Sequence, residues 1–186
     1  MNTEQAYNQW ASQYDTNRNR TRDLEAIALR RTVARLAVDR CLEIGCGTGK
    51  NTEWLATHCN HVTAVDFSEG MLGIARAKIS ALPGQIGHDI VRFHQADILQ
   101  PWTFADGLYD LVTFSLVLEH VADLDPVMQE AARALKPGGH VYIGELHPFK
   151  QYGGTKARFE TDVVSKWSPA STIMFRTSYK LRWGPG

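Results

Sequence analysis

Apolar and polar positions alternate in blocks along the chain. Five short apolar runs have the length and composition of strands, and the most apolar of them would be buried on both faces. They lie at residues 41–45, 61–66, 90–93, 108–115 and 139–146. Four other segments have the spacing of helices, with apolar side chains recurring on one face. They lie at residues 22–37, 50–58, 69–80 and 124–135.

This order of segments predicts an α/β fold. Because strands alternate with helices, we expect a doubly wound, mostly parallel sheet with helices on both faces. The helix expected at 124–135 is followed by Lys136-Pro137-Gly138-Gly139, which predicts a helix stop and a turn before the last strand. With 186 residues, 44% of them hydrophobic, the chain has the size of one domain.

Charge and cysteine content narrow the expected partners. The 20 Lys and Arg residues balance the 20 Asp and Glu residues, so no overall positive field would hold a nucleic acid, and we expect none as a partner. Cys41, Cys46 and Cys59 form no CxxC pair, so we expect neither a disulfide framework nor a metal site. The polar N-terminal residues and the lack of a membrane-length apolar run predict a cytoplasmic protein without a membrane partner.

A glycine-rich turn follows the first predicted strand. Residues 41–56 read CLEIGCGTGKNTEWLA, with glycines at Gly45, Gly47 and Gly49. In a doubly wound sheet, ligands bind beyond the carboxyl ends of the strands, and glycines there allow the backbone to approach a ligand closely. The helix that follows offers free backbone N–H groups. The turn therefore indicates a nucleotide-like ligand, although such glycines also occur in turns that only make a tight connection.

Aspartates end the next two predicted strands. Asp66 comes 21 residues after Gly45, close to the spacing of about 20 at which an acid meets a ribose in dinucleotide-binding folds. A carboxylate can accept hydrogen bonds from both ribose hydroxyls. Asp97 follows the third strand, where it could accept from the exocyclic amine of a base, or simply stabilise a turn.

The spacing of the glycines separates two classes of ligand. Dehydrogenase sites use GxGxxG and bind a diphosphate, whereas this chain has GxGxG with Glu43 two residues before it. A carboxylate at Glu43 would repel a diphosphate but could help to hold a cationic amine. A nicotinamide-dependent oxidoreductase is therefore the less favoured alternative.

Several motifs, taken in this order, carry a family resemblance. The segment EIGCGTG, Asp66, Ala96-Asp97-Ile98, the run DLVTFSLVLEHV and the turn LKPGG resemble class I S-adenosylmethionine-dependent methyltransferases of the small-molecule type, over roughly residues 7–150. The resemblance implies S-adenosylmethionine as cofactor and a single domain over residues 1–186. That domain would comprise a helical cap at 1–37, a cofactor-binding core at 38–150 and an atypical tail at 151–186.

The resemblance also implies roles for individual residues. The glycine segment would cradle the methionine part of the cofactor, Asp66 would accept from the ribose, and Ser115 would line the methionine side. The residues of the glycine segment are Glu43 as support and Gly45, Cys46, Gly47 and Gly49 through the backbone. Phe67 and Met71 would flank the adenine, and Asp97 and the Ile98 amide would form hydrogen bonds with the polar edge of its ring.

The N-terminal stretch YNQWASQYD resembles the cap of small-molecule methyltransferases, where aromatic side chains close over the cofactor. Tyr7 and Tyr14 are candidates for that role. The alternative is that they pack a helix onto the sheet.

Methyl transfer demands alignment and exclusion of water more than covalent catalysis. A hydroxyl acceptor would also benefit from a base, for which histidine is suited. His147 in GELHPF and His120 in SLVLEHV follow predicted strands, and Glu119 is a further candidate on the acceptor side. These three residues have no spacing typical of a metal site.

The tail departs from the family pattern, because residues 151–186 lack the expected helix. Apolar alternation between Ile173 and Trp183 is compatible with an edge hairpin. A shift of reading frame after Val164 is a second hypothesis, under which the last strands would be missing or altered. Methyl transfer to a small-molecule acceptor is the leading function, and a non-catalytic module that binds S-adenosylmethionine or S-adenosylhomocysteine is the alternative.

Overall fold

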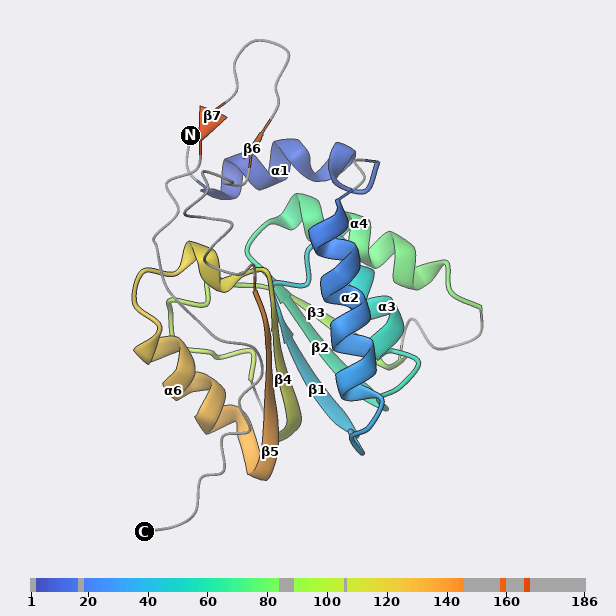
Figure 1. Ribbon diagram of the computed structural model, residues 1–186, viewed down its shortest axis with the longest axis vertical. Helices are drawn as coiled ribbons and strands as arrows, with labels where there is room; N and C mark the ends of the chain where they lie inside the picture. The colour runs from blue at the N-terminus through green and yellow to red at the C-terminus, as the bar shows by residue number, and fades with distance from the viewer. Residues whose placement is uncertain are drawn as a thin grey trace.

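The computed structural model describes residues 3–16, 19–83, 89–105 and 107–145, and two short strands further along the chain. Five parallel strands form one sheet, in the order β3-β2-β1-β4-β5 (Figure 1). Their bounds are β1 Arg40–Ile44, β2 His61–Asp66, β3 Val91–Gln95, β4 Tyr109–Ser115 and β5 Leu135–Gly144. The predicted parallel α/β sheet is confirmed. Its strand order reverses between β1 and β4, which is where such sheets bind ligands.

Helices cover both faces of this sheet. The described helices are α1 Thr3–Tyr14, α2 Arg20–Val33, α3 Lys50–Leu55, α4 Glu69–Ser80 and α6 Asp125–Ala134, with a short 3-10 helix, η1, at Leu118–His120. One apolar cluster lies between the sheet and α2, α3 and α4; Leu29, Leu55 and Leu72 from these helices pack there with Cys41 and Leu111 of the strands. This face holds three helices against the sheet because each presents an apolar stripe.

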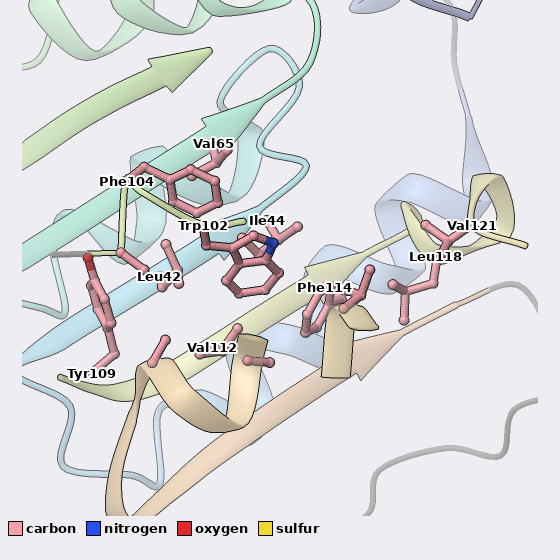
Figure 2. Packing of buried hydrophobic residues seen from close by; sticks show 14 of the residues in the cluster. Leu42, Ile44, Val65, Trp102, Phe104, Tyr109, Val112, Phe114, Leu118 and Val121 are labelled. Carbon is pink, nitrogen blue, oxygen red and sulfur yellow. The ribbon is translucent and has the colours of Figure 1, made fainter. Parts of the chain in front are cut away.

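The opposite face carries a second apolar cluster, under α6 and residues 102–105 (Figure 2). Trp102 is 1% exposed and stacks on Phe104 with ring centroids 5.5 Å apart. Leu42 of β1 and Phe114 of β4 point into this cluster, whereas the alternate positions of both strands point to the other face. Burial on both faces explains why the strands read as nearly continuous apolar runs.

Local signals set the helix boundaries. The helix expected at 22–37 begins earlier because the side chain of Asn19 accepts hydrogen bonds from the backbone N–H groups of Thr21 and Arg22. It ends at Val33, before the expected boundary. The helix α4 has the predicted bounds, and the Ser68 side chain caps its first turn by accepting from Met71 N.

The turn expected before the last strand is a bulge within that strand. Tyr109 pairs with Leu135 and Leu111 pairs with His140, so the intervening residues of β5 loop out of register. Gly138 at φ +81° provides the backbone conformation that this excursion needs. The strand β5 therefore begins at Leu135, four residues before the expected start at 139.

Beyond the main sheet, the structure describes β6 Arg158–Phe159 and β7 Lys166–Trp167, which pair antiparallel. The expected hairpin between Ile173 and Trp183 lies outside the described residues, as do nearly all the residues concerned by the frame-shift hypothesis. Among the helices that the structure describes, none combines the length and apolar character required to cross a bilayer.

Candidate functional site

A cavity of about 230 Å³ lies at the carboxyl ends of the strands, with Tyr7 and Tyr14 of α1 in its wall. The helix α1 lies across this end of the sheet (Figure 1). Nine of the twelve residues predicted to bind a cofactor line it. They are Tyr14, Gly45, Gly47, Asp66, Phe67, Met71, Asp97, Ile98 and Ser115. Segments from four of the five strands therefore meet at the reversal of strand order, as expected for an open α/β sheet.

The glycine turn forms the floor of the cavity. The backbone N–H groups of Gly45 and Cys46 both donate to the carbonyl oxygen of Val65, at 2.8 and 2.9 Å. Gly45 has φ +74°, and a Cβ there would lie 2.7 Å from Cγ2 of Val117. Gly47 has φ +54°, but a Cβ there would meet nothing within 4 Å. Gly45 is thus required by packing and conformation, whereas the space beside Gly47 stays open to a ligand.

Asp66 organises the polar side of this floor. Its Oδ2 accepts from Gly47 N at 2.8 Å and its Oδ1 accepts from Ser68 N at 2.9 Å. Burial raises the pKa of this carboxyl, and the backbone N–H groups oppose that rise. Each carboxylate oxygen has two acceptor positions, so Asp66 can hold the loop and still accept from a diol in the cavity.

Asp97 and its neighbours form another part of the wall. Oδ1 of Asp97 accepts from Leu99 N at 2.9 Å, so the residue stabilises a turn as well as lining the cavity. Phe67 is 37% exposed whereas Met71 is 1% exposed. These apolar side chains give the cavity a surface suited to a flat ring.

Three predicted cofactor residues do not line the cavity. Glu43 is buried behind it, where Thr52 Oγ1 donates to its Oε2 at 2.6 Å, and burial raises the pKa of Glu43 to about 8. In this structure Glu43 does not face the cavity, where the sequence predicts its contact with a cationic amine. Its hydrogen bond with Thr52 instead joins the strand before the glycine turn to α3. Cys46 is buried, and Gly49 permits close packing, since a Cβ there would lie 3.0 Å from that of Ala75.

Polar contacts fix α1 over the cavity. Oδ1 of Asn8 accepts from Ser68 Oγ at 2.6 Å and from Gly70 N at 2.9 Å, at the start of α4. Asp15, just after α1, accepts from Thr48 Oγ1 at 2.8 Å and pairs with Lys78 at 2.6 Å. The chain after α1 is thus tied to the glycine turn itself.

Aromatic packing orients the two tyrosines of α1. The guanidinium of Arg22 lies 4.0 Å from the ring centroid of Tyr14, and the Trp10 ring packs edge-on against Tyr14. The Tyr7 hydroxyl lies 2.8 Å from Nε2 of His120. Both tyrosines therefore take part in the packing of α1 and also line the cavity, and closure of their rings over a cofactor stays a prediction.

His120 lines the cavity, and burial lowers its pKa, which favours the neutral imidazole. Oε1 of Glu119 lies 3.7 Å from Nε2 of His120, and burial raises the pKa of Glu119. Glu119 does not itself line the cavity. His147 lies outside the described residues. Within the described ranges, no group of three or more His, Cys, Asp or Glu side chains could hold a metal ion.

Comparison with known proteins identifies the family. A model described as a methyltransferase domain matches residues 42–143, which is more than half of the chain. The chain belongs to the methyltransferase-domain family. It is 39% identical over 120 residues to a demethylmenaquinone methyltransferase of Clavibacter sepedonicus, covering 64% of this chain and 46% of the relative. It is 35% identical over 112 residues to a ubiquinone biosynthesis O-methyltransferase of Marinobacter nauticus, covering 60% of this chain and 46% of that protein.

Solved structures agree with this placement and with the class I methyltransferase fold. The N-methyltransferase NodS of Bradyrhizobium japonicum, in complex with S-adenosylhomocysteine, matches 82% of this chain and 79% of its own at a TM-score of 0.67 and 26% identity. A DhpI complex with S-adenosylhomocysteine matches 90% of this chain and 76% of its own at a TM-score of 0.68 and 28% identity. The chain spans about half the length of the curated relatives it matches.

Some lining residues of the methyltransferase domain were missed from the sequence. They are Ser68, Leu99, Val117 and Val121. Each lies within a few residues of a predicted site residue, so closeness in sequence to the motifs was the feature that could have identified it. Asn8, which docks α1, had no motif to identify it, because its partners are about 60 residues away.

Proposed function

We propose that this protein transfers a methyl group from S-adenosylmethionine to a small-molecule acceptor. The observation that carries the proposal is the Asp66 carboxylate, which lies at a glycine-lined cavity with acceptor positions left for a ribose diol. The NodS and DhpI complexes with S-adenosylhomocysteine support the same cofactor. Because the chain matches only part of its curated relatives, the activity is a proposal for the whole protein.

The residues present fit such a cofactor. Space beside Gly47 allows a ligand to approach the backbone, and Ser115 has a buried hydroxyl oxygen without a partner among the described residues. Asp66 would accept from the ribose, Phe67 and Met71 would contact the adenine, and Asp97 would read its edge. The direct cradle would then consist of Gly45 and Gly47, with Glu43, Cys46 and Gly49 supporting the turn from behind.

Bound S-adenosylmethionine supplies a methyl group that is activated by a neighbouring sulfonium. The chain's own contribution is to align the acceptor and to exclude water, which α1 favours by lying over the cavity. For a hydroxyl acceptor, Nε2 of His120 is suited to receive the proton, since the lowered pKa keeps the imidazole neutral. In the structure, the Tyr7 hydroxyl lies within hydrogen-bonding distance of Nε2 of His120. The acceptor hydroxyl would replace Tyr7 as the partner of this nitrogen.

A small molecule suits the site better than a macromolecule. The cavity is compact, its wall includes several apolar side chains, and the formal net charge of the chain is zero. The relatives named for demethylmenaquinone and ubiquinone biosynthesis make quinone precursors a reasonable first set of acceptors. We retain cytoplasmic localisation as a prediction from the sequence.

Methyl-labelled S-adenosylmethionine tests the activity directly. The protein is incubated with phenolic, quinol, amine and carboxylate acceptors, and transfer of label to each acceptor is measured beside a His120→Asn variant. Label in an acceptor, with turnover reduced about 10²-fold or more in the variant for a hydroxyl acceptor, supports the proposal. Cofactor binding without transfer to any acceptor class would instead favour the non-catalytic binding module.

A further inference from the structure

The segment that follows β4 has an unusual backbone. Leu116 has φ +56°, and it is the one non-glycine residue with a positive φ among the described residues. Such a conformation is unfavourable for leucine and persists only where the surroundings hold it. Leu116, Val117, His120 and Val121 all line the cavity, so whatever holds this segment also shapes the site.

The end of β5 supplies the holding contacts. The backbone N–H groups of Val117 and Leu118 both donate to the same oxygen of Glu145, Oε1, at 2.9 and 2.8 Å. One residue earlier, Leu116 N donates to the carbonyl oxygen of Gly144 at 2.7 Å. Three successive backbone N–H groups of the segment therefore donate to Gly144, the last residue of β5, and to Glu145, the residue that follows it.

Apolar packing holds the other side of the same segment. Leu118 and Val121 are each 3% exposed and join the apolar cluster next to Phe114 (Figure 2). The Glu145 carboxylate holds the start of η1 by accepting from the N–H groups of Val117 and Leu118, because backbone N–H groups removed from water need a partner. A carboxylate is a stronger acceptor for them than a neutral group.

Two groups at the cavity depend on this fixation. The Val117 side chain lies against Gly45, where no Cβ can be accommodated, and His120 meets the Tyr7 hydroxyl at 2.8 Å. We propose that Glu145 is a positioning residue, which holds residues 116–120 so that Val117 closes the glycine turn and His120 faces the acceptor. The catalytic part of this inference rests on the proposed function.

The charge around Glu145 makes the contact sensitive to pH. The titratable neighbours that act on it are Glu119 of η1 and Glu25 of α2, and it acts in turn on Tyr142 and Tyr7. Burial raises the pKa of Glu145 to about 7, and the two backbone N–H groups oppose that rise. Both forms of the carboxyl are then populated near neutral pH, and the ionised form accepts more strongly.

The experiment compares Glu145→Ala and Glu145→Gln with wild type. Glutamine keeps an oxygen that can accept both N–H groups, whereas alanine removes it. Glu25→Ala is the control, since Glu25 is a buried glutamate that is hydrogen-bonded to Asn51 and Tyr142 rather than to the segment. NMR of the Val117 and Leu118 amides and of the His120 imidazole follows the segment, and unfolding curves verify that each variant is folded.

In the wild type, the two amide proton shifts are expected to titrate near pH 7 because of Glu145. In Glu145→Gln the part of this titration that comes from Glu145 disappears, while the imidazole signal of His120 stays as in the wild type. In Glu145→Ala both amide shifts and the His120 signal change, and kcat/KM falls about tenfold or more, since small misplacements of reacting groups are costly. Glu25→Ala keeps the amide titration but moves it to lower pH, because the repulsion from Glu25 that helps to raise the pKa of Glu145 is lost.

A wild-type His120 signal in folded Glu145→Ala would overturn the proposal, and so would amide titration curves that are the same in Glu145→Gln and in the wild type. Should the alanine variant fail to fold, the comparison of wild type with Glu145→Gln still tests the contact of Glu145 with the two amides, on which the positioning role depends. The NMR measurements need no cofactor. If the wild type binds no S-adenosylhomocysteine, the proposed function fails while the role of Glu145 is still tested.

Discussion

Replacing Gly45 by alanine should destabilise the protein more than the same change at Gly47. Both glycines have positive φ, at +74° and +54°, so each substitution forces an L side chain into an unfavourable backbone conformation. Only at Gly45 does the new Cβ also collide with a neighbour, 2.7 Å from Cγ2 and 2.8 Å from Cβ of Val117. Gly47→Ala is thus a control for conformation without collision.

The magnitude follows from these two contributions. The backbone conformation costs an L residue roughly 1–2 kcal/mol, which applies to both variants. Overpacking adds about 1–3 kcal/mol at Gly45 alone, because the contacts of Glu145 and the neighbouring cluster prevent Val117 from moving away. We therefore expect the unfolding free energy to fall by roughly 2–5 kcal/mol in Gly45→Ala.

Urea unfolding measures the difference. At an unchanged m-value, the midpoint of Gly45→Ala should lie below that of Gly47→Ala. Ligand binding should show a different pattern, since the methyl group of Gly47→Ala enters the cavity and should weaken binding of S-adenosylhomocysteine without a further loss of stability. Equal midpoints for the two variants would refute the reasoning about Val117.

Two further predictions concern groups behind and above the cavity. Glu43 has a pKa raised to about 8, so the folded state retains a proton that the unfolded chain loses above its ordinary value of 4.5. Glu43 should therefore contribute a loss of unfolding free energy as the pH rises from about 5 to 8, and Glu43→Gln should lack this contribution, so the difference in unfolding free energy between wild type and variant should change by at most about 1.4 kcal/mol per pH unit. A difference in unfolding free energy that stays constant with pH would contradict the assignment. Asn8→Ala removes the acceptor for Ser68 Oγ and Gly70 N and should lower the unfolding free energy by about 0.5–1.5 kcal/mol, whereas Asn8→Asp keeps the acceptor. Equal unfolding free energies for Asn8→Ala and Asn8→Asp would argue against the docking contact.

Periodicity and motif order were sufficient for the architecture. Apolar runs with burial on both faces identified the five parallel strands, and the glycine turn with Asp66 and Asp97 indicated which end of the sheet carries the cavity. These features could be predicted because each is encoded within a few neighbouring residues. The bulge at 136–139 could not, since the pairing of β5 with β4 decides where a strand begins.

Contacts between distant segments could not be predicted from the sequence. Tyr7 meets His120 across 113 positions, and Val117 meets Glu145 across 28. Such pairs depend on how the helices and loops pack, and no local pattern records them. For Glu43 the sequence indicated proximity to the glycine turn, but its burial behind the turn follows from the direction in which the strand presents its side chain.

The most direct test of the account is a calorimetric titration of S-adenosylhomocysteine into the purified protein and its Asp66→Ala variant. Asp110→Ala serves as the carboxylate control, since Asp110 lies outside the cavity wall, and NAD serves as the ligand control. The account predicts binding of S-adenosylhomocysteine to the wild type and to Asp110→Ala, affinity lower by about tenfold or more in Asp66→Ala, and no heat from NAD. A folded wild type that binds no S-adenosylhomocysteine, or an Asp66→Ala variant that binds it equally well, would contradict the central claim.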